Sequence, residues 1–152
     1  MSGRRRQVAC LAALAAALGA CAQPAPAPPS TPEVARLEEL AQIFYVRVSN
    51  RRFNSISTFH DPALREFFHS PEAFADDYAD FADDLAMASF EYNRPNPFVI
   101  EDFEFQSDGS VQIRIVFTGE SNKPLRFWNT RLLRGDRWEY ADGRWWITPG
   151  KR

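Results

Sequence analysis

Residues 138–147 have the sequence WEYADGRWWI, in which aromatic and polar side chains flank a tight-turn signal. Asp142-Gly143 predicts a two-residue β-hairpin turn, because such turns need positive φ angles that glycine adopts without strain. The residues on either side of the turn, 137–140 and 144–148, are therefore predicted as paired strands. Adjacent side chains of a strand point to opposite faces. We expect one of Trp145 and Trp146 to lie in the core, and the other to be partly exposed or covered by another segment.

Upstream of this hairpin the same two-residue period continues. Val111, Ile113 and Ile115 alternate with polar residues, which is typical of a half-buried strand. Asp108-Gly109 precedes this strand and predicts another hairpin. Before that turn the apolar positions change phase near Glu101-Asp102, which predicts a β-bulge that bends the strand. The sequence thus indicates an antiparallel meander of four to five strands, at residues 98–105, 111–118, 125–133, 137–140 and 144–148, with 89–92 as a further candidate.

The first half of the domain has the three- to four-residue apolar spacing of amphipathic helices. Three segments combine a capping side chain with a proline at the first helical position, where no N–H is needed. These segments are Thr31-Pro32-Glu33, Asp61-Pro62-Ala63 and Ser70-Pro71-Glu72. We expect a first helix of about 18 residues, short helical turns around residues 53–59 and 64–68, and a fourth helix after Ser70.

The predicted fourth helix carries five aspartates opposite its apolar stripe, namely Asp76, Asp77, Asp80, Asp83 and Asp84. Carboxylates at four-residue steps share a helix face, and their oxygens suit calcium or magnesium. However, a straight helix cannot wrap around a small ion, and the sequence has no loop of the EF-hand type. We therefore expect a solvated acidic face, no bound metal and no cofactor.

Helices followed by a bent antiparallel sheet predict an α+β fold in which the helices cover one face of the sheet. In this layout the chain resembles the NTF2-like superfamily, which includes ketosteroid isomerase and the SnoaL-like cyclases. The residues that carry the resemblance are Phe44-Tyr45, residues 59–68 and the WEYADGRWWI stretch. The resemblance covers residues 33–150. It implies a cone in which N-terminal helices pack on a curved sheet and enclose an apolar pocket.

Enzymes of this superfamily use a tyrosine and acidic residues in that pocket to move a proton beside a carbonyl group. By the resemblance, Tyr45 lies where the isomerases carry their tyrosine. Of the acids, Asp102 and Glu104 remain as candidates for the pocket, and the face that they occupy depends on the predicted bulge. Arg114 has two interpretations, a ligand for an anion in the pocket or a cross-strand pair with an acid. The candidate pocket residues are Tyr45, Asp102, Glu104, Arg114 and Trp128. No catalytic residue is assigned, because no serine or cysteine stands in a recognisable nucleophile motif.

Residues 1–20 are typical of a secretory signal peptide. Three arginines, residues 4–6, precede an uncharged apolar run of 11 residues, 8–18, which is too short to span a bilayer. Leu18-Gly19-Ala20-Cys21 resembles the lipobox of bacterial lipoproteins. That resemblance implies cleavage before Cys21, lipidation of its thiol, and a protein anchored on the periplasmic face of the bacterial envelope. The alternative is an ordinary secretory signal in which Cys21 is incidental.

Residues 21–32 form a predicted tether, with five prolines and no large apolar side chain, a composition that favours extended polyproline II. Ala22 is not the aspartate that retains enterobacterial lipoproteins in the inner membrane, so we expect the outer membrane. Residues 1–20 contain three of the 18 basic side chains and none of the 20 acidic ones, which leaves a net charge of −5. This charge argues against nucleic acid as a partner.

Two classes of function remain open from the sequence. The first is a lipid-anchored envelope module that holds a small apolar ligand or a protein partner, with the membrane contacted through the anchor. The second is a small isomerase- or cyclase-type enzyme that uses Tyr45 with Asp102 or Glu104. A buried carboxylate beside Tyr45 in an open pocket would favour the enzyme.

Overall fold

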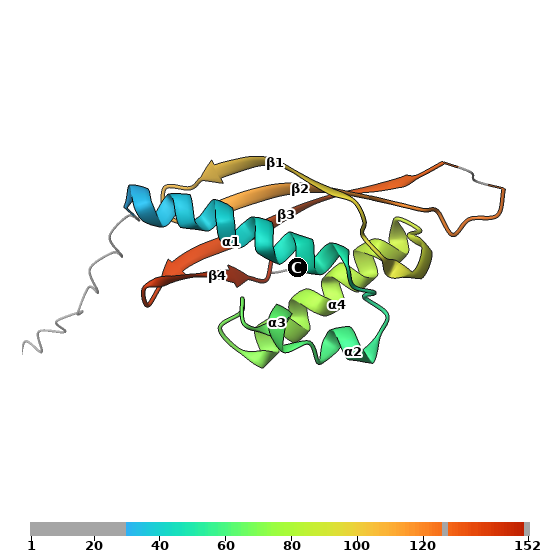
Figure 1. The fold of residues 1–152 in the computed structure, drawn as a ribbon, viewed down its shortest axis with the longest axis horizontal. Helices are drawn as coiled ribbons and strands as arrows, with labels where there is room; N and C mark the ends of the chain where they lie inside the picture. Colours follow the sequence, from blue (N-terminus) through green and yellow to red (C-terminus); the bar gives the residue numbers. More distant parts are fainter. Residues whose placement is uncertain (1–29, 126–127, 151–152) are drawn as a thin grey trace, which may run out of the picture.

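The computed structural model describes residues 30–125 and 128–150 (Figure 1). Within these residues, helices come first and an antiparallel sheet with strand order β1-β2-β3-β4 follows. The predicted α+β class and meander topology are therefore confirmed. The elements are α1 Thr31–Ser49, α2 Ile56–Phe59, α3 Pro62–Arg65, α4 Pro71–Met87, the 3-10 turn η1 Glu91–Asn93, β1 Phe98–Phe105, β2 Val111–Gly119, β3 Thr130–Ala141 and β4 Arg144–Thr148.

Polar side chains cap the N-termini of two of the helices, as predicted. Asp61 accepts a hydrogen bond from the N–H two residues later (2.9 Å) at the start of α3, and Ser70 accepts one from the N–H three residues later (3.1 Å) at the start of α4. These bonds satisfy N–H groups that have no partner within a helix. The first helix begins one residue earlier than predicted, because its N-cap is Ser30 and Thr31 is already helical.

The strands differ from the prediction in two places. Residues 89–92 are not a strand, because the backbone forms η1 there and only Phe90 makes an isolated bridge, to Ser121. The two strands predicted at 125–133 and 137–140 are one strand, β3, which begins at Thr130. Nine consecutive residues of β2 pair with β3, so Gly135 and Asp136 stay in the ladder instead of ending a strand.

The predicted bulge in β1 is confirmed. The register of β1 with β2 shifts between Ile100 and Asp102, so one extra residue, Glu101, stands in β1. Because a bulge adds one residue, side chains that point to the same face of the sheet are three positions apart across it instead of two. As a result Ile100 and Phe103 are both partly buried against the core.

One face of the sheet is buried against the helices. Ile113, Ile115 and Phe117 of β2 are buried and form one core cluster with Phe44 of α1 and Phe81 of α4. The aromatic side chains of this core meet mostly in tilted or edge-to-face pairs, with ring centroids 4.5–6.4 Å apart, a geometry favourable for aromatic rings.

The two adjacent tryptophans of β4 lie on opposite faces, as expected. Trp145 is buried in the core. Trp146 lies on the other face, where it stacks on the His69 ring at 4.3 Å and lies under the Arg144 guanidinium at 3.9 Å. The outer tryptophan is therefore covered by polar side chains of its own chain.

The two edge strands of the sheet, β1 and β4, differ in whether another segment of the chain pairs with them. Beside β4, the Ile147 N–H donates to the Phe67 carbonyl oxygen at 2.8 Å, and Phe68 forms a parallel bridge with Ile147. Among the described residues, no strand or isolated bridge pairs with the outer side of β1. The edge formed by β1 is thus the open one, and α1 lies beside it (Figure 1).

Candidate functional site

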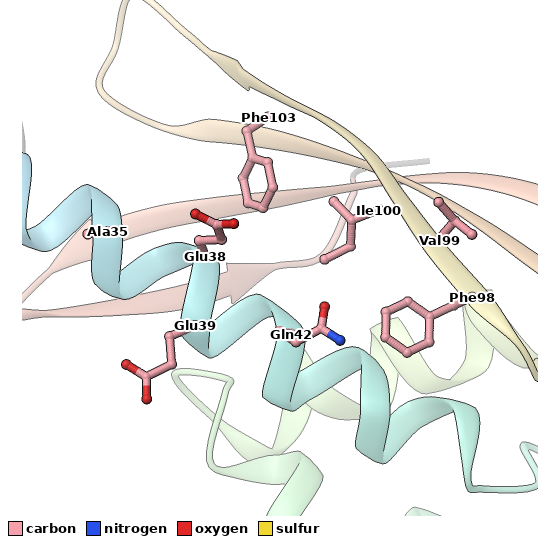
Figure 2. Close-up of a pocket in the computed structure, with 8 residues that line it drawn as sticks. All are labelled: Ala35, Glu38, Glu39, Gln42, Phe98, Val99, Ile100 and Phe103. Atoms are coloured by element: carbon pink, nitrogen blue, oxygen red, sulfur yellow. The ribbon is translucent and has the colours of Figure 1, made fainter.

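A groove lies between α1 and the edge strand β1, with a cavity volume of about 800 Å³. Figure 2 shows Phe98, Ile100 and Phe103 directed from β1 toward α1. From the helix, the groove is lined by Ala35, Glu38, Glu39 and Gln42, and from the strand also by Val99. The volume lies within the range of small-ligand pockets.

Helical spacing explains why α1 contributes these residues. Positions 35, 38, 39 and 42 are three or four residues apart, so they occupy one helix face. The buried stripe of α1, which includes Leu37, Ala41 and Phe44, faces the core instead. The helix therefore divides its surface between a core-facing stripe and a polar stripe that borders the groove.

The groove combines an apolar side with an acidic side. Phe98, Ile100 and Phe103 are all partly buried and pack against the core, while Glu38 and Glu39 of α1 are exposed. None of the side chains that line the groove is basic. An apolar molecule with a positively charged end would match both sides, since the carboxylates would face the charge and the rings would cover the apolar part.

Tyr45 lies in the core, and its hydroxyl forms hydrogen bonds with other buried side chains. It is fully buried, and its Oη donates to Asp136 Oδ2 at 2.8 Å. The Trp138 Nε1–H donates to the same Oη at 3.4 Å. Its ring packs against Phe44, Phe98 and Phe117. Burial raises the pKa of the Tyr45 phenol well above its ordinary value, and the negative charge of Asp136 adds to the rise.

The other predicted pocket residues do not meet Tyr45. Asp102 pairs with Arg114 across the strands at 2.6 Å, with both side chains about half exposed, so the cross-strand interpretation of Arg114 is the one observed. Glu104 is exposed opposite Gln112. Gln112 and Arg114 alternate with the buried residues of β2, so they lie on the face of the sheet away from the helices. Their partners in β1, Glu104 and Asp102, lie on the same face. Trp128 is exposed, in the connection from β2 to β3.

A buried charge cluster joins α4 to β3, and sequence reasoning missed it. The Arg134 guanidinium forms ion pairs with Asp77 of α4, through Nη2, and with Asp136, through Nε at 2.5 Å. It also lies over the Phe81 ring at 4.5 Å. The cluster contains two carboxylates and one cation. Alternation along β3 could have indicated it, since Arg134 and Asp136 are in phase with the inward-facing Trp138.

The expectation that all five aspartates of α4 are solvated is therefore wrong for Asp77. Burial raises its pKa to about 7, and the charge of Arg134 offsets only part of this effect. Asp76 and Asp83 are exposed as expected, and Asp80 and Asp84 are partly buried. Among the residues that the structure describes, no three His, Cys, Asp or Glu side chains are grouped so that they could hold a metal ion.

The lipidation prediction falls outside the described residues, because Cys21 and residues 22–29 of the predicted tether lie in the segment 1–29. The prediction that the tether extends to residue 32 is wrong, because Thr31 and Pro32 already belong to α1. In the part of the chain that is described, no helix is both long enough and apolar enough to cross a membrane. Comparison of the chain with protein-family models, with curated proteins and with solved structures gives no match in any of the three.

Proposed function

We propose that this protein is a lipid-anchored module of the bacterial envelope, facing the periplasm from the outer membrane, that binds an apolar ligand with a positively charged end. The N-terminal signal pattern and Cys21 support the anchor. The groove between α1 and β1, with an apolar side formed by β1 and two carboxylates on α1, is the observation that supports binding. Helices that precede a four-stranded antiparallel meander support an NTF2-like cone as the fold.

An isomerase-type reaction receives no support from the interior. Such a reaction needs a carboxylate base and a donor that both reach the substrate. The Tyr45 hydroxyl already donates to Asp136 within the core, and Asp102 is paired with Arg114 on the opposite face of the sheet. Binding without catalysis is therefore the simpler function for this arrangement.

Binding can be tested with two probes of equal chain length, decyltrimethylammonium and the uncharged decyl maltoside, followed by titration calorimetry. We expect saturable binding of the cationic probe. Replacing both groove carboxylates, Glu38→Gln with Glu39→Gln, should weaken that binding about fivefold, because exposed charge pairs contribute up to about 1 kcal/mol. Decyl maltoside should bind the variant and the unmodified chain equally.

A matched control removes two acids of β1, Glu101→Gln with Glu104→Gln. Both side chains are exposed and neither lines the groove. The control leaves the affinity for decyltrimethylammonium unchanged if the ligand lies in the groove. Equal weakening by the two double variants, or no saturable binding of either probe, would reject the proposed ligand class.

A further inference from the structure

Backbone groups of β1 point away from the sheet at its open edge. Residues of an antiparallel edge strand alternate between those that bond to the neighbouring strand and those whose N–H and C=O groups face outward. The Thr118 N–H donates to the Pro97 carbonyl oxygen at 2.8 Å, so the next residue, Phe98, faces outward, and Ile100 does so two positions later. Among residues 30–125 and 128–150, no backbone group outside the sheet bonds to Phe98 or Ile100.

The bulge at Glu101 limits how far this free edge extends. Beyond the bulge, the Phe103 N–H donates to Asp102 Oδ1 at 2.9 Å, so this backbone donor already has a partner within its own strand. Bulges of this kind restrict pairing along an edge strand. The free stretch is therefore residues 98–100, which suits a short extended segment rather than a long strand.

The residues of the free stretch also form part of the groove. Phe98 and Ile100 direct their side chains toward α1 (Figure 2), while their backbone groups face the edge. A strand added at this edge would place every second side chain on the same face, between the apolar side of the groove and the exposed carboxylates of Glu38 and Glu39. Apolar side chains would cover the rings, and a lysine could lay its stem along them with its ammonium at the carboxylates.

We propose that the groove binds an extended polypeptide segment of alternating apolar and basic residues, which pairs with residues 98–100 as an additional strand. The inference deepens the proposed function and rests on it, because it names the ligand class of the same groove. Main-chain hydrogen bonds give such strand addition its affinity, and the side-chain positions give it specificity.

A second copy of the chain fits this edge less well than a basic segment. The strand carries three consecutive or nearly consecutive acids, Glu101, Asp102 and Glu104. Antiparallel pairing of two β1 strands would bring acids of both copies together, and like charges on paired strands are destabilising. None of the side chains that line the groove is basic, so the charge favours a cationic partner.

Amide hydrogen exchange, followed residue by residue by NMR, tests the pairing on the chain that begins at Cys21. The probe is a peptide of alternating lysine and valine, about nine residues long, which is a usual strand length. At a free peptide concentration of about ten times its Kd, exchange of the Phe98 and Ile100 N–H groups should slow about tenfold, because they exchange only from the unbound protein. The Val99 N–H, which faces β2, should change little.

Two control peptides separate backbone pairing from charge. The first has the same side chains but a methyl group on every backbone nitrogen, so it can neither donate hydrogen bonds nor approach the edge closely. The second has glutamate in place of lysine. Neither peptide should slow the exchange of Phe98 and Ile100.

Two matched double variants test the charge on the protein. Glu38→Gln with Glu39→Gln should weaken binding of the lysine peptide about fivefold, because exposed charge pairs contribute up to about 1 kcal/mol. Asp76→Asn with Asp83→Asn removes the same charge from exposed positions of α4 and should leave the affinity unchanged. Equal weakening by both double variants would overturn the charge match.

Strand addition is overturned if the lysine peptide leaves the exchange of Phe98 and Ile100 unchanged, or if the methylated peptide slows it as much. Protection that rises with protein concentration in the absence of peptide would assign the edge to a second copy and also overturn it. Binding of decyltrimethylammonium without protection by the peptide would leave the proposed function standing. Protection by the peptide together with a Cys21 that is unmodified in cells would support strand addition and reject the lipid-anchored function.

Discussion

Arg134 is shared by Asp77 and Asp136, so the core holds one more negative charge than positive charge at this point. Burying an uncompensated charge is unfavourable, and a buried carboxyl responds by retaining its proton. This explains why the pKa of Asp77 rises from its ordinary value of 3.8 to about 7. The cluster therefore has a consequence for stability as well as for packing.

The first prediction concerns the pH dependence of stability. Between about pH 4 and pH 7, Asp77 keeps its proton in the folded chain and loses it in the unfolded chain, so the free energy of unfolding falls as the pH rises. A shift of this size corresponds to at most about 4 kcal/mol. Asp77→Asn should remove this decrease, measured by urea unfolding at pH 4, 5.5 and 7.

Asp83→Asn is the control for this prediction, because Asp83 is exposed on the same helix. The control should follow the pH dependence of the unmodified chain. A similar pH dependence in Asp77→Asn and Asp83→Asn would show that Asp77 is not the group that titrates.

The second prediction concerns the Tyr45 hydroxyl. Tyr45→Phe keeps the ring in the core but leaves Asp136 Oδ2 without its donor and the Trp138 N–H without its acceptor. A buried polar group without its partner costs about 1–3 kcal/mol. Guanidinium unfolding should show a loss of that size, whereas Tyr92→Phe, at an exposed tyrosine, should change little. Equal stability of Tyr45→Phe and the unmodified chain would contradict the assignment.

At the scale of the element, the end of β2 depends on a close approach between Gly119 and Phe90. A Cβ at Gly119 would lie 2.5 Å from Phe90 Cδ1 and 3.1 Å from the Arg94 carbonyl oxygen. Phe90 is fully buried, so its ring has little room to move. The glycine therefore allows η1 to pack against the base of the β2–β3 hairpin.

The third prediction follows from this contact. Gly119→Ala should lower the free energy of unfolding by about 1–3 kcal/mol, the usual cost of overpacking a core. Gly135→Ala is the control: its Cβ would meet the Gln112 side-chain amide at 2.6 Å, and the end of a flexible side chain can move. Thermal unfolding of the two variants should therefore differ, and equal transition temperatures would show that the Phe90 contact is relaxed at low cost.

The elements that the sequence predicts well are those with local signals. The caps at Asp61 and Ser70, the turns at 108–109 and 142–143 and the bulge near Glu101 all depend on neighbouring residues. The length of β3 does not depend on neighbouring residues alone, because Gly135 stays in the strand through its pairing with β2. The same limit applies to the candidate site: the groove forms between α1 and β1, and local periodicity does not show which helix borders which strand.

At the scale of the whole molecule, the proposed lipid anchor at Cys21 precedes α1, the helix that borders the groove. Within the described residues, α1 begins at one end of the domain, and the end of β2 and the start of β3 lie toward the other (Figure 1). The groove runs between α1 and the open edge strand β1. A lipid on Cys21, as proposed, would keep this groove within reach of the membrane surface.

The most direct test of the account is mass spectrometry of the N-terminal peptide of the protein, isolated from membranes of its own host. We predict that the first residue is Cys21 and that its thiol carries a diacylglyceryl group in thioether linkage. A chain that begins elsewhere, or a Cys21 with a free thiol, would contradict lipid anchoring and the envelope function that depends on it.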